Sequence, residues 1–275
     1  MSSGPSFIPS SLTEVAVEAT QAGGAVLREH FGGVLDIRYK GEIDVVTQAD
    51  LKAEAAIVGV IRQHFPDHQI LAEEGTTGGA DPAHRWIIDP LDGTTNFSHG
   101  LPPFSVSVAY EHDGRIEAGV IYDPTQGELF VARRGAGATL NGRSIQVSSV
   151  SILRRGLLAT GLPYETDRLP LALGQFCAFA RRAQAVRRIG SAALDLAYVA
   201  AGRFDGYWEA SIHSWDIAAG MLLVEEAGGQ VTDLAGQPIN LNAAHITILT
   251  SNGILHPMML ETLDEARPLN LSYLD

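Results

Sequence analysis

Apolar residues recur at helical spacing in several parts of the chain. Between residues 11 and 31 they fall every three or four positions after Ser11-Leu-Thr-Glu14, the pattern of a capping box, which predicts an amphipathic helix ending near Phe31. Thr47 is placed to cap a second helix with apolar positions from Leu51 to Ile61. Further helices are expected over 171–182, 192–201, 216–227 and from 254 onwards.

Short runs of β-branched and aromatic residues separate these helices and predict strands. The run Trp86 to Ile88 precedes Pro90, so a buried strand that ends at Asp89 is expected. Between Phe104 and Tyr110 larger apolar residues alternate with small ones, which predicts a half-buried antiparallel strand. Asn141-Gly142 is a typical hairpin turn. Other strands are expected over 34–39, 70–72, 116–122, 128–132 and 246–249.

The composition is that of a globular protein with an ample core. Of 275 residues, 45% are hydrophobic and 19% charged, and neither a long apolar segment nor a low-complexity stretch interrupts the chain. Residues 1–10, rich in Ser, Pro and Gly, are expected to be mobile. Residues 11–275 are then expected to form one domain, in which two halves join near 145–170.

Charge and cysteine usage narrow the possible partners and the compartment. The formal charge of −13 argues against nonspecific binding to nucleic acid or to an anionic membrane. The single Cys177 lies in an apolar stretch, so it is expected to be a small core residue, and no internal disulfide can form. Without a signal-peptide pattern near the start, these features predict a cytoplasmic protein.

Two carboxylates follow the apolar run at Trp86. Asp89 and Asp92 flank Pro90-Leu91, and Gly93-Thr94-Thr95 then supplies a tight turn whose N–H groups can point at an anion such as phosphate. Crowded carboxylates repel each other unless a hard cation lies between them, and Mg²⁺ prefers oxygen ligands. A solvated acidic loop is the alternative for Asp-x-x-Asp alone.

Several other kinds of site lack their usual pattern. The nine histidines include no pair at zinc-protease spacing, and one cysteine gives no cysteine-based zinc site. Gly135-Ala-Gly137 resembles a nucleotide-binding loop, but Leu140 stands where the third glycine is needed. A phosphate-binding loop with Gly-Lys-Ser/Thr and a Gly-x-Ser-x-Gly elbow are also absent from the sequence, which disfavours nucleoside triphosphatases and serine hydrolases.

The longer string Asp89-Pro-Leu-Asp-Gly-Thr-Thr-Asn-Phe97 resembles the signature of the inositol monophosphatase family, which are Mg²⁺-dependent, lithium-sensitive phosphatases. Three more stretches agree in the family's order: Asp44 to Asp50, Glu73-Glu74-Gly75, and Trp215 to Gly229. Gly75 stands where serine is commoner. Gly190-Ser-Ala-Ala-Leu-Asp195 is similar to the bacterial members.

This resemblance implies a layered αβαβα sandwich and hydrolysis of a sugar or inositol phosphate, most simply myo-inositol 1-phosphate, by a metal-activated water. It places one Mg²⁺ on Glu73, Asp89 and the Leu91 carbonyl, and a second on Asp89, Asp92 and Asp216, with a weaker third ion near Glu73. For Asp50 and Asp216, helix capping is the role that the residues alone would favour.

The resemblance also implies the reacting and recognising residues. Thr94, linked to Asp50, would orient the attacking water, and Glu73 joins them as a catalytic residue. His213 is expected to pack or to form a hydrogen bond near the site. The expected substrate-binding residues are Asp92, Gly93, Thr94, Thr95, Arg188, Gly190, Ser191, Ala192, Glu209 and Asp216.

Three questions stay open at this point. Relatives that share the metal motifs act on fructose 1,6-bisphosphate, histidinol phosphate, adenosine 3′,5′-bisphosphate or NADP, so the ester is not fixed. Some bacterial relatives also bind transcription machinery, a role that the cluster Arg181, Arg182, Arg187 and Arg188 could serve. Family members are commonly homodimers, which predicts a homodimer here.

Overall fold

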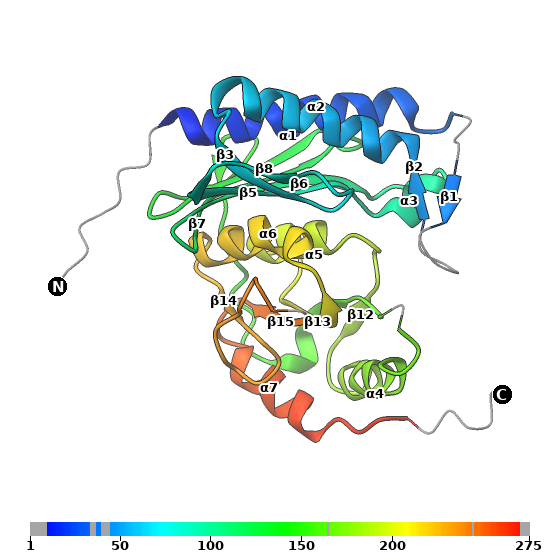
Figure 1. Cartoon of the computed structure of the whole chain (residues 1–275). Coiled ribbons are helices and arrows are strands. Elements are labelled where there is room, and N and C mark those ends of the chain that lie inside the picture. Colours follow the sequence, from blue (N-terminus) through cyan, green and yellow to red (C-terminus); the bar gives the residue numbers. More distant parts are fainter. Residues whose placement is uncertain (1–9, 34–36, 40–44, 164, 244, 270–275) are drawn as a thin grey trace.

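Helices and sheets alternate in five layers in a computed structural model of the chain, which describes residues 10–33, 37–39, 45–163, 165–243 and 245–269 (Figure 1). A helix pair covers an eight-stranded sheet, a second helix pair lies beneath that sheet, and a five-stranded sheet and two further helices complete the stack. This is the expected αβαβα sandwich. The expected mobility of the N-terminus concerns residues 1–9, which lie outside the described residues, as do 34–36 of one expected strand.

The outer helix pair agrees with the sequence pattern. Helix α1 spans Ser10–His30 and helix α2 spans Gln48–His64. Thr47 caps α2, because its side chain accepts a hydrogen bond from the N–H of Ala49 while its own N–H donates to Asp50 at 2.9 Å. Apolar residues of both helices form one core with the face of the sheet that carries Trp86 and Ile88.

The eight-stranded sheet has the order β10-β9-β8-β7-β6-β5-β3-β4, with β3 and β5 parallel and the other neighbours antiparallel. Asn141-Gly142 forms the expected hairpin turn between its last two strands. A separate two-stranded sheet pairs β1 with β2. The bounds are β1 Ile37–Tyr39, β2 Val45–Thr47, β3 His68–Ala72, β4 Thr77–Gly78, β5 Asp81–Asp92, β6 Ser105–His112, β7 Arg115–Asp123, β8 Glu128–Arg133, β9 Gly137–Leu140 and β10 Arg143–Ser144.

Two strand predictions need correction. Strand β5 does not end at Asp89 but continues to Asp92, with an irregular register opposite β6 between these residues. The bulge accommodates Pro90, which has no N–H to give to the ladder. Strand β6 is buried on both faces rather than one, because the sheet lies between two helix layers, and Ser105 and Ser107 are therefore buried.

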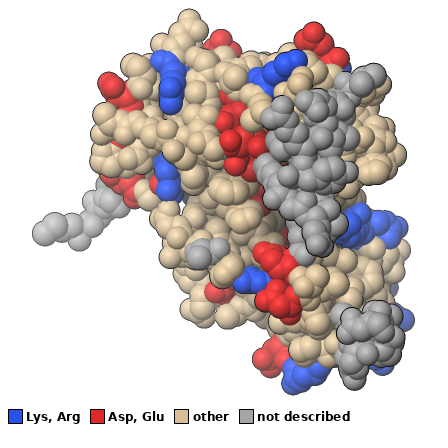
Figure 2. Space-filling view, turned by 45° about the vertical axis from the view of Figure 1, so that its right-hand side comes forward, with Lys and Arg blue, Asp and Glu red and all other residues tan. Residues whose placement is uncertain are grey.

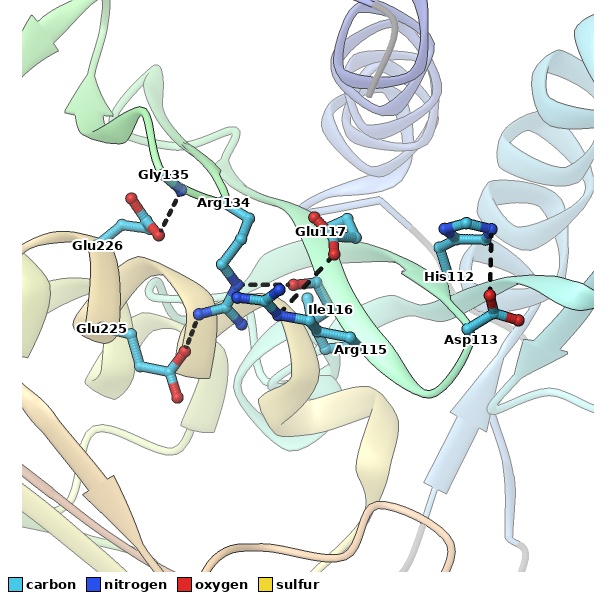
Figure 3. Close-up of polar contacts among 9 residues, drawn as sticks. All are labelled: His112, Asp113, Arg115, Ile116, Glu117, Arg134, Gly135, Glu225 and Glu226. Carbon is cyan, nitrogen blue, oxygen red and sulfur yellow. Dashed lines mark hydrogen bonds and ion pairs between the residues drawn. The ribbon is translucent and has the colours of Figure 1, made fainter. Parts of the chain in front are cut away.

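The middle helix layer consists of α5, Ala192–Ala200, and α6, Ser214–Glu226. Helix α6 lies very close to β7 at Gly119, where a Cβ atom would come within 2.7 Å of the Ala219 carbonyl oxygen. At its other end α6 is tied to the β8–β9 turn, because Arg134 pairs with Glu225 and the N–H of Gly135 donates to Glu226 (Figure 3).

The five-stranded sheet has the order β12-β11-β13-β15-β14, with strands at β11 Leu157–Thr160, β12 Ala185–Arg187, β13 Gly206–Ile212, β14 Gln230–Thr232 and β15 Ile246–Ser251. Helices α4, Leu169–Ala180, and α7, His256–Glu265, cover its outer face, and a short 3-10 helix, Leu153–Arg155, precedes β11. Cys177 on α4 is exposed, so the expectation of a core cysteine is wrong. None of the described helices is long and apolar enough to cross a membrane.

Candidate active site

The acidic motifs meet where the parallel strands β3 and β5 end. Ala72 pairs with Ile88 in the ladder, and the N–H of Glu73 donates to the Ile88 carbonyl at 3.1 Å. Glu73 and Asp89 therefore lie side by side at the same end of the sheet. Figure 2 shows acidic side chains gathered along the middle of the face on which this end of the sheet opens.

Asp89 lies at the centre of the acidic group and is only 1% exposed. Its Oδ1 accepts a hydrogen bond from the N–H of Leu91 at 2.9 Å. Burial raises the pKa of Asp89 well above its usual value, and the negative charges of Glu73, Asp92 and Asp216 raise it further. A charge repelled from three sides requires a nearby cation if it is to stay ionised.

Asp92 connects the first sheet to the helix layer below it. The Ser191 hydroxyl donates to it at 2.5 Å, and the N–H groups of Ala192 and Ala193 donate at 3.2 and 2.7 Å. Desolvation raises the pKa of Asp92 to about 6, although these hydrogen bonds act in the opposite direction. The expected residues Ser191 and Ala192 thus hold the Asp92 carboxylate.

Asp216 caps helix α6 and also lies among the acidic residues of the site. In the first turn of α6 its carboxylate accepts from the N–H of His213 at 2.8 Å, which completes a capping box. Desolvation and the charges of Glu73 and Asp92 raise its pKa well above the usual value, so it also belongs to the acidic group. His213 stacks on Trp215 at 4.7 Å, which agrees with its expected packing beside the site.

The group formed by Glu73, Asp89, Asp92 and Asp216 fits divalent cations. Every potential ligand atom is an oxygen, and the carboxylates of Asp89 and Asp216 each have a raised pKa partly because their acidic neighbours crowd them. Oxygen donors with excess negative charge suit hard ions such as Mg²⁺.

A threonine and a further acid lie beside this group. The Thr94 hydroxyl is 2.9 Å from the Leu91 carbonyl oxygen and 3.3 Å from Oδ1 of Asp50. Asp50 cannot turn away, because its other oxygen accepts both the N–H and the hydroxyl of Thr47. Desolvation raises the pKa of Asp50 to about 6. The expected link between Thr94 and Asp50 is present.

A glycine starts the turn that follows Asp92. Gly93 has φ of 96°, and a Cβ atom there would lie 3.2 Å from the Gly190 carbonyl oxygen, so only glycine fits. The turn leads into helix α3, Thr94–Ser98, in which Thr95 is exposed. Asn96 holds the 190 loop against the turn by donating to the Ile189 carbonyl at 2.8 Å, a positioning role that the sequence did not indicate.

The remaining expected residues form a second polar group below Asp92. Desolvation raises the pKa of Glu209 to about 7, and the positive charge of Arg188 acts in the opposite direction. The Tyr207 hydroxyl donates to Glu209. Asp195 is buried close by, where desolvation, Glu209 and Asp92 raise its pKa well above the usual value. Asp195 and Tyr207 were missed as site residues, because a single acid in a helix and a tyrosine in a strand carry no local signal.

Glu54 on helix α2 fixes the loop that follows β3. The carboxylate of Glu54 on α2 accepts from the N–H groups of Glu74 and Thr76 at 2.9 and 3.1 Å, and also from the Thr76 hydroxyl. Glu54 is nearly fully buried. It therefore positions the backbone next to Glu73, although its place in the middle of a helix gave no indication of this.

Comparison with known proteins agrees with this geometry. A model of the inositol monophosphatase family matches residues 8–267. The inositol-1-monophosphatase of Synechocystis is 45% identical over 94% of this chain and 92% of its own length, and the Nus factor SuhB of Pseudomonas aeruginosa is 41% identical over 94% and 98%. The crystal structure of extragenic suppressor protein suhB from Bartonella henselae superposes with a TM-score of 0.90 at 42% identity, covering 93% of this chain and 99% of that one.

Proposed function

The chain belongs to the inositol monophosphatase family, and from this membership we propose that it hydrolyses myo-inositol 1-phosphate to myo-inositol and phosphate. It is a phosphoric monoester hydrolase, and its family is metal-dependent. The observation that supports the proposal most is the crowded acidic group around Asp89, next to the pair of Thr94 and Asp50.

The acidic residues are proposed as the ligands of two or three Mg²⁺ ions. Glu73, Asp89 and the Leu91 carbonyl would hold one ion, and Asp89, Asp92 and Asp216 would hold another, with a weaker third near Glu73. When bound, such ions supply a nucleophile near neutral pH and neutralise charge on the phosphoryl and leaving oxygens. The raised pKa values of Asp89 and Asp216 support this assignment, because a cation removes the repulsion that causes part of each shift.

Thr94 and Asp50 are proposed to orient the attacking water, with Glu73 as the third catalytic residue. The Thr94 hydroxyl faces two acceptors, the Leu91 carbonyl and Asp50, so its proton is directed into the protein. Its oxygen lone pairs are then free to accept a hydrogen bond from water on the open side. Asp50 is fixed by Thr47, which keeps this direction constant.

The substrate is proposed to lie between the turn at Gly93 and the 190 loop. The N–H groups of Gly93 and Thr94 would bind phosphate oxygens, with Thr95 at the rim. Ring hydroxyls would face the second polar group. The residues proposed for the ring and its phosphate are Asp92, Arg188, Gly190, Ser191, Ala192, Glu209 and Asp216.

The test is phosphate release from myo-inositol 1-phosphate with and without Mg²⁺. We expect activity that requires Mg²⁺ and that falls at least about 100-fold in Thr94→Val, which keeps the shape of the side chain but removes its hydroxyl. Thr125→Val is the matched control on the turn between β7 and β8, where the Thr125 hydroxyl donates to Asp123. Equal rates in EDTA and in Mg²⁺ would rule out the proposed reaction.

Other esters are tested in the same assay. Fructose 1,6-bisphosphate, histidinol phosphate, adenosine 3′,5′-bisphosphate and NADP share the phosphate that the acidic group would engage. We expect the highest kcat/KM for the inositol ester, and inhibition of that reaction by millimolar Li⁺. A higher kcat/KM for one of the other esters would identify that ester as the substrate instead.

A second candidate function is contact with transcription machinery, since relatives from Pseudomonas aeruginosa and Pasteurella multocida are named Nus factor SuhB. We propose the cluster of Arg181, Arg182, Arg187 and Arg188 as the contact surface. Arg182 pairs with Glu265 on α7, and Arg187 is exposed. Tagged protein with Asp89→Asn should still retain transcription proteins from a lysate of its host, whereas Arg181→Glu/Arg187→Glu should lose them.

We also propose that the protein is a cytoplasmic homodimer with all catalytic residues supplied within each chain. The common two-fold assembly of soluble proteins supports the dimer. The small residues of α5 do not, because they are buried in the core of the chain itself. Light scattering behind a sizing column should give about twice the 29.3 kDa chain mass. A monomer across a wide concentration range, with full activity, would contradict the dimer and leave the metal ligands unaffected.

A further inference from the structure

Three potential metal ligands meet at the other end of the strands that carry the acidic site. His68 begins β3, whereas Asp81 and His84 lie at the start of β5. One ligand atom from each of these side chains lies within 4.8 Å of the other two. Five residues of extended chain separate His84 from Asp89, about 16 Å at 3.3 Å per residue, so this group is distinct from the acidic site.

An irregularity of the ladder brings these side chains together. His68 pairs with Asp81, but the next pair is Gln69 with Arg85, so three residues of β5 have no partner on β3. A bulge of this kind redirects side chains. It places His84 beside Asp81, with Nε2 of the imidazole 3.8 Å from Oδ2 of the carboxylate.

Two of the three ligands are already oriented for a cation. Asp81 keeps one oxygen on the N–H of Ala83 at 3.0 Å and turns the other toward His84. Nδ1 of His84 lies 2.5 Å from the Tyr110 hydroxyl. Burial raises the pKa of Tyr110 to about 12, so the phenol stays neutral and its oxygen can accept a hydrogen bond from Nδ1–H of His84, which leaves a lone pair on Nε2. Hydrogen bonding of the second nitrogen is usual for metal-binding histidines.

The group is also accessible from solution. The side chains of His84 and Asp81 are 29% and 40% exposed, so an ion can enter from solution. The ring of His68 stacks on Phe65 at 4.6 Å and on His84 at 4.5 Å, with the two imidazoles nearly parallel, and His84 stacks on His112 at 4.6 Å. Because an imidazole binds a metal ion in the plane of its own ring, the His68 ring must rotate before both histidines can reach one ion. Burial and the neighbouring His84 lower the pKa of His68, which favours the neutral imidazole that a metal requires.

We propose that His68, Asp81 and His84 form a second cation site, selective for a divalent transition metal such as Zn²⁺ or Co²⁺. Two imidazoles and one carboxylate suit these ions, whereas Mg²⁺ prefers oxygen ligands. A tetrahedral ion bound by three side chains keeps one position for water. The site would join the first residue of β3 to the first residues of β5.

One hydrogen bond must change when the ion binds. The indole N–H of Trp86 donates to Nδ1 of His68 at 3.1 Å. Because an indole N–H can only donate, Nδ1 holds a lone pair, and Nε2 of the neutral ring carries the proton. When the metal binds Nε2, the proton of the neutral ring must move to Nδ1. Nδ1–H and the Trp86 N–H are then both donors and cannot form a hydrogen bond with each other. The Trp86 hydrogen bond is therefore lost on metal binding, and Trp86 becomes a reporter of the site.

The experiment uses the full chain with Asp89→Asn and Asp216→Asn, which remove ligands of the acidic site. Co²⁺ is titrated while its visible absorption is recorded, and Zn²⁺ is titrated by calorimetry. We expect one equivalent of either ion, bound at least about tenfold more weakly after His84→Gln or His68→Gln. His112→Gln is the matched control, because His112 is in the same stack but pairs with Asp113 at 3.6 Å instead (Figure 3).

A nitrogen-edited NMR spectrum supplies a second measurement. The protein has three tryptophans, and only the Trp86 indole resonance should shift on addition of Zn²⁺. The same affinity in His84→Gln as in His112→Gln, or an unchanged Trp86 resonance at saturation, would overturn the proposal. In the otherwise unmodified enzyme, His84→Gln should leave Mg²⁺-dependent phosphate release unchanged, so the two proposals succeed or fail separately.

Discussion

At the residue scale, Asp89 has opposing effects on activity and on stability. Its pKa is raised, so the folded state holds a proton more tightly than the unfolded state, whose value is near 3.8. The ionised group therefore lowers the free energy of unfolding increasingly as pH rises above that value. Removing this charge should stabilise the protein whenever no cation balances it.

Asp89→Asn is accordingly expected to raise the melting temperature in EDTA at pH 7 and to reduce Mg²⁺-dependent phosphate release at least about 100-fold. The same change should abolish most of the thermal stabilisation by added Mg²⁺. Asp113→Asn is the control, because Asp113 is 75% exposed and pairs with His112. A lower melting temperature of Asp89→Asn in EDTA would contradict the predicted repulsion.

His256 should contribute to acid sensitivity. It is buried between the hydroxyls of Thr232 and Ser251, at 2.9 and 3.0 Å, and desolvation lowers its pKa from 6.5 to about 4. Between these values the unfolded state binds the proton more tightly, so stability is lost as pH falls from about 6.5 toward 4. The urea midpoint should fall less between pH 7 and pH 5 in His256→Gln than in the wild type. His245→Gln, at an exposed position, should behave as the wild type does.

The sequence predicted residues whose signal is local and missed those whose role arises from packing. Asp89, Asp92 and Thr94 stand in one string, and Thr47 with Asp50 forms a capping box within four residues. Asn96 and Glu54 form hydrogen bonds with residues that lie 20 or more positions away in the chain, so the sequence did not indicate these contacts. The role of Asp195 depends on its burial, which a single acid in a helix does not reveal. His68 and His84 also come together only through the pairing of β3 with β5, so their spacing in the sequence did not indicate a zinc site.

At the element scale, most helices and strands lie close to their predicted places, and the errors come from tertiary context. The expected helix over 171–182 spans Leu169–Ala180, because its proline occupies the first turn, where no N–H is needed. Strand β6 was expected to have a solvent face because small polar residues alternate along it. Those residues instead meet the middle helix layer, where the Ser107 hydroxyl donates to the Trp215 carbonyl.

Helix α6 depends on Gly119 for its position. Gly119→Ala should push the helix away from β7, since its Cβ would meet backbone atoms of Ala219. We expect a loss of about 1–3 kcal/mol in the free energy of unfolding. Because α6 carries Asp216, we also expect weaker activation by Mg²⁺.

Gly59→Ala provides the matched comparison in helix α2, where nothing lies within 4 Å of an added Cβ. It should raise the free energy of unfolding by about 0.5–1 kcal/mol through helix propensity. Both variants are measured by urea unfolding and by the Mg²⁺ dependence of phosphate release. Equal effects of the two substitutions would show that the close approach at Gly119 does not matter.

At the scale of the whole molecule, the pattern of strands and helices was compatible with five layers but could not order them. β3 pairs with β5, and β11 pairs with β12 and β13, in parallel ladders. Other elements lie between most of these strands in the chain, so their pairing could not be deduced from local pattern. The resemblance to a family supplied that arrangement. The acidic site lies where the upper sheet meets the middle helices, so its acidic residues come from both layers.

The hydrogen bonds of Asp92 have a consequence for amide hydrogen exchange. N–H groups in the first turn of a helix normally exchange quickly with solvent, because no carbonyl of the helix accepts from them. In the first turn of α5, the N–H groups of Ala192 and Ala193 donate to the carboxylate of Asp92, which belongs to the eight-stranded sheet. They can exchange only when the two layers separate, so their exchange rates measure the opening of the molecule. Bound Mg²⁺ should slow both rates together, while Asp92→Asn should make both amides exchange as quickly as those of an ordinary helix end.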